Sequence, residues 1–177
     1  MSKTGRVLFQ IVLFASFGTL MFISDIAMEV LPNIHLLAMF IVIFTVVYRV
    51  KALIPIYVYV FLTLFYSGFG TWALPYLYVW TVLWGIVMLL PKNMPPKIAV
   101  VVYMAVAGLH GILFGVLYAP AQMLLFGLRW EQMWVWIGAG LPFDVVHCIG
   151  NTVSGILILP LVGVLKKLPG AIIEKTE

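Results

Sequence analysis

The chain alternates between long apolar runs and short polar stretches. The apolar runs cover residues 7–24, 34–48, 52–65, 72–90, 98–118 and 141–165. A transmembrane helix needs about 20 mostly apolar residues, and most of these runs approach that length. The runs are continuous and lack an apolar–polar alternation of period two, so the pattern favours helices over a transmembrane barrel. We therefore expect an all-α integral membrane protein with six transmembrane helices, forming a single domain over residues 1–177.

Polar stretches predict where these helices end. Arg49 and Lys51 predict a tight turn between the second and third runs, and the glycine-rich stretch 67–71 predicts another. The proline-rich stretch 91–97 is the clearest loop, and residues 25–35 predict a loop or helix end. Residues 119–140 mix polar side chains with three tryptophans. We expect this stretch to be an outer connection lying partly in the membrane interface, where tryptophan is enriched.

Composition supports the membrane class. Hydrophobic residues make up 64% of the chain and charged residues 9%, a balance far more apolar than that of soluble domains. The single cysteine, Cys148, excludes a disulfide framework and is expected to be a packing residue. The net charge of +4 is interpreted as a topology signal, with no nucleic-acid partner expected.

The basic residues predict the orientation. Nine of the ten lie at the termini or in the second and fourth connections, which a six-helix topology places on one side. They are Lys3, Arg6, Arg49, Lys51, Lys92, Lys97, Lys166, Lys167 and Lys175, whereas Arg129 lies on the other side. By the positive-inside rule, both termini are cytoplasmic in a multi-pass protein of the cell (plasma) membrane. Residues 25–35, 67–75 and 119–142 would then form the outer face.

The last run carries a column of polar side chains. If Pro142 occupies the first turn of a helix, Asp144, His147 and Asn151 lie on nearly one face over about 10 Å. Such a column is costly in a membrane unless it faces protein, water or a ligand. Two interpretations remain open: a cluster of interhelical hydrogen bonds, or a substrate site. Asp144 can alternatively cap the start of its own helix by accepting backbone N–H bonds.

Aromatic residues recur at helical spacing on two further runs. Together with the polar column, they predict a cavity that stacks on a flat ring and hydrogen-bonds its edges. The candidate substrate-binding residues are Asp144, His147, Asn151, Tyr76, Trp80, Trp84, His110 and Tyr118. Interface anchoring is the alternative for the outer aromatics, core packing for Trp84, and interhelical hydrogen bonding for His110. Glu29 and Asn33 have two interpretations, the mouth of the same site or a solvated loop, of which the loop is favoured.

Small residues on the first run predict a close helix–helix contact. Ala15 and Thr19 are one turn apart, with Gly18 beside them, and Gly150 and Ser154 repeat the spacing on the last run. Spacing alone leaves open whether the contact is within the chain or with another protein.

Three phrases carry a resemblance to a known family. They are Leu-Pro-Asn-Ile at 31–34, Tyr-Leu-Tyr-Val-Trp at 76–80, and the stretch 141–151. In their order and spacing, the chain resembles the substrate-binding S components of energy-coupling factor (ECF) vitamin transporters, over nearly its whole length. Within that family, it is most similar to members assigned to hydroxymethylpyrimidine or vitamin B6 compounds.

The resemblance implies a transport role with specific partners. Such a subunit binds a vitamin from outside and docks on a membrane coupling subunit, which sits on two cytoplasmic ATPases. ATP is then used by the partners, and no cofactor is expected in this chain. The family docks through Ala-x-x-x-Ala on the first helix, which implies docking through Ala15, Gly18 and Thr19, although Thr19 replaces the second alanine.

Two other functions stay open. The chain carries no Walker-type loop, Gly-x-Ser-x-Gly or His-Glu-x-x-His motif, so neither ATP hydrolysis nor those hydrolytic mechanisms is indicated. Two histidines and an aspartate can in principle hold a metal, but no second cluster supports hydrolytic chemistry, and we expect no metal. The alternatives are a small intramembrane enzyme using Asp144 and His147 as an acid/base pair, and a structural membrane partner without ligand.

Overall fold

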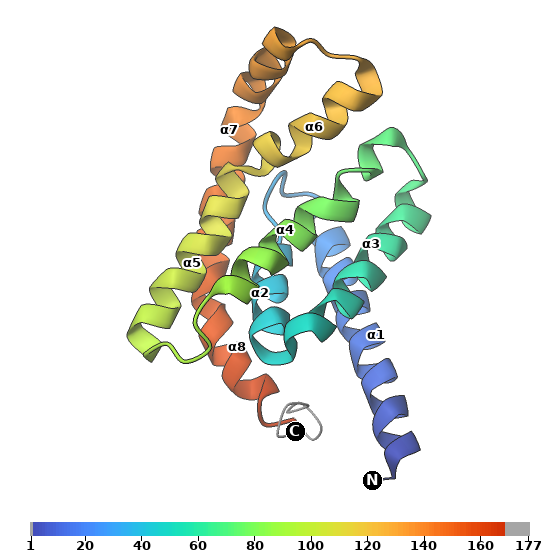
Figure 1. The fold of residues 1–177 in the computed structure, drawn as a ribbon, viewed down its shortest axis with the longest axis vertical. Helices are drawn as coiled ribbons and strands as arrows, with labels where there is room; N and C mark the ends of the chain where they lie inside the picture. The colour runs from blue at the N-terminus through green and yellow to red at the C-terminus, as the bar shows by residue number, and fades with distance from the viewer. Residues whose placement is uncertain (1, 169–177) are drawn as a thin grey trace.

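Helices account for every regular element of this protein between residues 2 and 168, the part that the computed structural model describes (Figure 1). The α-helices are α1 (Lys3–Ala27), α2 (Leu37–Tyr48), α3 (Leu53–Ser67), α4 (Tyr76–Leu89), α5 (Pro96–Ile112), α6 (Phe114–Phe126), α7 (Trp130–Ser154) and α8 (Ile158–Leu165). Three short 3₁₀ helices join them: η1 (Arg49–Ala52), η2 (Thr71–Ala73) and η3 (Gly155–Leu157). The all-α prediction is confirmed for this part of the chain. Lys175, used above for the topology, lies outside the described residues.

Five helical stretches of the described chain are long and apolar enough to cross a membrane. They are Thr4–Ala27, Leu37–Ser67, Thr71–Leu89, Pro96–Phe126 and Trp130–Leu165. The second stretch is broken at Arg49, whose positive φ of 53° ends α2. Figure 1 shows α2 and α3 running in opposite directions from this break. The turn expected at Arg49 and Lys51 is therefore present, while six membrane spans remain a prediction.

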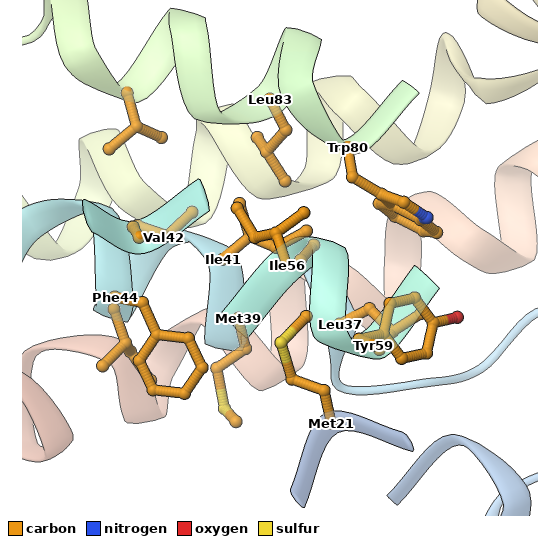
Figure 2. Close-up of a cluster of buried hydrophobic side chains, with 14 of the residues drawn as sticks. Met21, Leu37, Met39, Ile41, Val42, Phe44, Ile56, Tyr59, Trp80 and Leu83 are labelled. Carbon is orange, nitrogen blue, oxygen red and sulfur yellow. The ribbon is translucent and has the colours of Figure 1, made fainter. Parts of the chain in front are cut away.

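The core is built around α2. Eight of its first nine residues are buried, because α2 carries apolar side chains on all its faces and neighbouring helices cover them. Figure 2 shows how neighbouring helices complete the core, with Met21 from α1, Ile56 and Tyr59 from α3, and Trp80 and Leu83 from α4. By contrast, large apolar side chains such as Val101, Leu124 and Val153 are exposed on the outside of the bundle. This outer surface is compatible with a lipid environment.

Glycines bring α5 and α6 close to α7. A Cβ added to Gly111 would lie 2.8 Å from the backbone of Cys148, and one added to Gly108 would clash with the Thr152 hydroxyl. Gly115, just after the break at Leu113, leaves room for the Asp144 carboxyl group in the same way. Small residues at this spacing let two membrane helices pack backbone to backbone. The contact fixes the polar face of α7 against α5.

The start of α7 differs from the sequence prediction. The helix begins at Trp130, so Pro142 lies inside it and not in its first turn. The Gln132 side chain accepts a hydrogen bond from the Arg129 N–H (2.8 Å), which caps the helix start. Most of 119–140 is accordingly helical, in α6 and α7, and only Gly127, Leu128 and Arg129 connect them. Pro142 deprives one carbonyl of its helical partner, a loss that membrane helices tolerate.

Candidate functional site

The three histidines of the chain meet at one place. His35 precedes α2, His110 lies on α5 and His147 lies on α7. The ring centroids of His35 and His147 are 4.5 Å apart, and those of His110 and His147 are 6.5 Å apart. Trp80 lies 5.8 Å from His35 and 5.6 Å from His110, while Phe114 lies 4.8 Å from His147. We call these five residues the histidine–tryptophan cluster.

Three members of this cluster carry buried polar atoms without a hydrogen-bond partner among the described residues. Trp80 is 1% exposed and its Nε1–H donates to nothing; His147 is 3% exposed and its Nε2 is equally unpaired. His110 Nε2 lies 3.1 Å from the Val79 carbonyl and must donate to it, which leaves Nδ1 as an unpaired acceptor. A buried unpaired polar group costs about 1–3 kcal/mol, so its presence in a native site calls for an explanation.

Asn151 extends the set one turn further along α7. Its side chain is fully buried, and its Nδ2 donates to the Ala107 carbonyl on α5 (3.2 Å). Its Oδ1 accepts no hydrogen bond from any residue between 2 and 168. The amide nitrogen thus joins α7 to α5, while the amide oxygen is free to accept a further hydrogen bond. This arrangement is compatible with both interpretations of the polar column, interhelical hydrogen bonding and substrate binding.

A cavity of about 220 Å³ adjoins the cluster, and His35 and Tyr76 line it. It lies between the end of α1, residues 28–35, the end of α3 and the start of α4. The Asp25 carboxylate lines it and accepts a hydrogen bond from the Tyr59 hydroxyl (2.9 Å). Its lining combines four aromatic side chains with six polar ones, a mixture suited to a small polar ligand.

Most of the predicted site residues come together. Tyr76, Trp80, His110 and His147 lie in or beside the cluster, with 5.9 Å between the Tyr76 and Trp80 rings. Tyr118 borders it, 6.4 Å from Tyr76, with its hydroxyl donating to the Trp72 carbonyl.

Trp84 is the exception. Its Nε1–H donates to the Arg49 carbonyl (3.1 Å), at the turn between α2 and α3. The prediction that Trp84 shares the site is not supported, because two further helical turns from Tyr76 carry it to the other end of α4.

Asp144 has a structural contact that the sequence did not predict. Both carboxylate oxygens accept the Gly115 N–H, at 3.2 and 3.1 Å, near the start of α6. Asp144 therefore caps a neighbouring helix, whereas the sequence suggested its own, because α7 starts 14 residues earlier. Among the described residues, no hydrogen bond joins Asp144 to His147.

Sequence reasoning missed the cavity residues Asp25, Thr63 and His35. Glu29, interpreted as part of a solvated loop, also lines the cavity. A usable signal was present: Asp25 and Glu29 are four residues apart at a helix end, and therefore face the same way. Burial lowers the pKa of His35 to about 4, so its imidazole is neutral at pH 7.

No group of three or more histidine, cysteine, aspartate or glutamate side chains among residues 2–168 is arranged to hold a metal ion. The three histidines pack edge to face instead. Comparison of the chain with protein-family models, curated proteins and solved structures finds no match.

Proposed function

We propose that this chain is the substrate-binding membrane subunit of an ECF-type vitamin importer. It binds a small heterocycle from outside the cell, with hydroxymethylpyrimidine or a B6 vitamer as the favoured class. A membrane coupling subunit and two cytoplasmic ATPases complete the transporter and supply the energy. The proposal rests on the resemblance in residues 31–34, 76–80 and 141–151 and on the site described above.

The observation that carries the proposal is the set of unpaired polar atoms beside an aromatic-lined cavity. Trp80 offers a donor, while His110 and Asn151 offer acceptors. A heterocycle with ring nitrogens and hydroxyl groups presents the complementary donors and acceptors. Its flat face stacks on Tyr76, which lines the cavity with its ring 5.9 Å from that of Trp80. Purely structural polar residues would be expected to satisfy one another, which these atoms do not.

The exposed surface of α1 supports docking through Ala15 and Thr19. Both residues are exposed. The Thr19 hydroxyl donates to the Ala15 carbonyl (2.9 Å), so its hydrogen bond is made within α1 and needs no partner from another helix. Gly18 already serves a contact inside the chain, because a Cβ there would lie 2.5 Å from the Val58 side chain on α3. We therefore propose Ala15 and Thr19 as the docking face, with Gly18 holding α1 against α3.

The test combines identification and uptake. The chain, expressed with and without a coupling subunit and its ATPases, is purified, and the small molecules released on denaturation are identified by mass spectrometry. We expect one retained heterocycle, recovered unchanged, and uptake of that compound only when all partners are present. Chemical conversion of the compound by the purified chain would support the enzyme alternative, and absence of any ligand would support the structural one.

A further inference from the structure

The cavity beside the cluster is lined by two carboxyl groups and by no lysine or arginine. Asp25 lies in the last turn of α1 and Glu29 follows that helix. His35 is the one side chain of the lining that can become positively charged, and it is neutral at pH 7. The formal charge of the lining is therefore negative, and nothing in the lining neutralises it.

The backbone adds to this negative potential. α1 ends at Ala27 and α3 ends at Ser67, next to the cavity, and the carbonyl end of a helix carries the negative pole of its dipole. An acidic side chain in the last turn of a helix lowers the stability of that helix. Helix stability therefore gives no reason for Asp25. Its hydrogen bond from the Tyr59 hydroxyl on α3 uses part of the carboxylate, and the rest is left to act as a counter-charge at the cavity wall.

Aromatic rings form much of the remaining wall. Phe22 and Tyr66 pack edge to face at 5.6 Å, and Trp72 and Tyr76 do so at 5.7 Å, all four lining the cavity. The faces of such rings attract cations, most strongly where water is excluded. Carboxylates combined with aromatic faces are suited to an ammonium group or a charged heterocycle.

A buried hydroxyl points independently to a ligand. Thr63 lines the cavity, is 8% exposed, and its Oγ1 has no hydrogen-bond partner among the described residues. A hydroxyl in this position can accept from an N–H or donate to a ring nitrogen. The cavity thus presents a hydrogen-bonding group that the protein leaves unused.

We propose that this cavity binds a positively charged nitrogen of the substrate, with Asp25 and Glu29 as counter-charges and Thr63 as a hydrogen-bonding partner. The substrate class is a single-ring heterocycle that carries a protonated amine or a quaternary nitrogen. A cavity of about 220 Å³ suits a single ring, since the pockets that hold drug-sized ligands measure roughly 300–1,000 Å³. This inference rests on the proposed function and adds the charge of the ligand to it.

Pyridoxamine and pyridoxine provide a matched pair of probes. They share a pyridine ring and differ in a protonated aminomethyl group against a neutral hydroxymethyl group. Calorimetry at pH 7 on the purified full chain in detergent should show pyridoxamine binding at least about tenfold more tightly, a difference of about 1.4 kcal/mol. Asp25→Asn and Glu29→Gln should each reduce this preference, and the double variant should abolish it.

The variants are chosen to preserve the fold. Asp25→Asn keeps an amide oxygen that accepts the hydrogen bond from the Tyr59 hydroxyl. The matched control is Glu131→Gln, because Glu131 lies in the first turn of α7 and does not line the cavity. This control should keep the full preference for pyridoxamine. Thr63→Val should weaken binding of both vitamers without lowering the melting temperature, because the hydroxyl has no partner to lose.

Three results would overturn the inference: equal affinity for the two vitamers, a preference that survives in the double variant, or no binding of pyridoxamine to the native chain. These are distinguishable from failure of the proposed function. Equal affinity together with partner-dependent uptake would remove only the charge assignment. Absence of both a retained ligand and uptake would remove the proposed function itself.

Discussion

Asn151 and His147 illustrate how a buried polar side chain can serve packing and binding at once. Each sits on the face of α7 turned toward α5 or the cluster, and each keeps one atom unpaired. We predict that Asn151→Ala and His147→Ala each weaken binding of the retained heterocycle by about one to two decades, the cost of one lost buried hydrogen bond. Calorimetry on folded protein measures this, with Val145→Ala on the exposed side of α7 as control. Unchanged affinity in both variants would place the site away from α7.

Asp144 allows a second prediction, about stability. Its carboxylate receives the Gly115 N–H where the break at Leu113 frees that group from the helical pattern. Asp144→Ala removes the acceptor and should lower the free energy of unfolding by about 1–2 kcal/mol, whereas Asp144→Asn retains one acceptor and should change it little. Thermal unfolding in detergent distinguishes the two. A severe effect of Asp144→Asn would instead point to a requirement for the charge.

The sequence predicted which polar side chains matter better than it predicted their contacts. His110 and His147 were identified because a polar residue inside an apolar run is conspicuous, and the structure does bring them together. His35, Asp25 and Thr63 were missed because residues near a run's end are usually solvated. Their burial comes from tertiary packing of α1, α3 and α4, which spacing along one helix cannot reveal.

The glycines of α5 and α6 determine how closely α7 approaches. Gly111 faces the backbone of Cys148, and a Cβ there would lie 2.8 Å from it, so one helix must move to admit even alanine. We predict that Gly111→Ala lowers the free energy of unfolding by about 1–3 kcal/mol, the usual range for overpacking. Gly85→Ala on α4, where nothing lies within 4 Å, is the matched control. It should be neutral or stabilising, because alanine favours a helix over glycine by about 0.5–1 kcal/mol. Equal effects of the two variants would contradict the close contact.

The two small residues Ala15 and Gly18 on α1 differ in what covers them. Ala15 is exposed and borders an apolar groove with α3, whereas Gly18 is covered by Val58. Ala15→Trp should abolish uptake and co-purification of the coupling subunit while sparing ligand binding, because it blocks close approach of another helix without disturbing the bundle. Val101→Trp, at a position that is also exposed, on α5, is the control. Uptake that survives Ala15→Trp would move the docking face elsewhere, with Gly150 and Ser154 as the next candidates.

Helix boundaries show what the hydrophobic pattern can and cannot predict. The ends of α2 at Tyr48 and of α8 at Leu165 match the ends of the apolar runs, because basic residues follow both. Pro142 suggests a helix start, since proline favours a first turn, yet the cap formed by Arg129 and Gln132 begins α7 earlier. A proline alone is therefore an ambiguous boundary signal in a membrane chain.

Across the whole molecule, charge is divided between two ends. The start of α1, the turn at η1, the α4–α5 connection and the end of α8 lie toward the lower end in Figure 1. These segments carry the basic residues of the described chain except Arg129, which lies between α6 and α7. Of the four acidic residues of the described chain, Asp25 lies in the last turn of α1 and Glu29 follows that helix, while Glu131 lies in the first turn of α7 and Asp144 further along it. A negative outer mouth would raise the local concentration of a cationic solute, and a basic inner face fits the positive-inside rule.

The distribution of basic residues makes the membrane topology testable. If Arg49, Lys92 and Lys167 face the cytoplasm, cysteines placed at Lys92 and Lys167 should resist an impermeant thiol reagent in intact cells and react after lysis. A cysteine at Ser67, where α3 ends beside the cavity, should react in intact cells. The experiment uses a Cys148→Ala background, which removes the one native thiol. Labelling at Lys92 in intact cells would contradict the six-span topology, because that residue lies in the connection that the even number of crossings places on the same side as both termini.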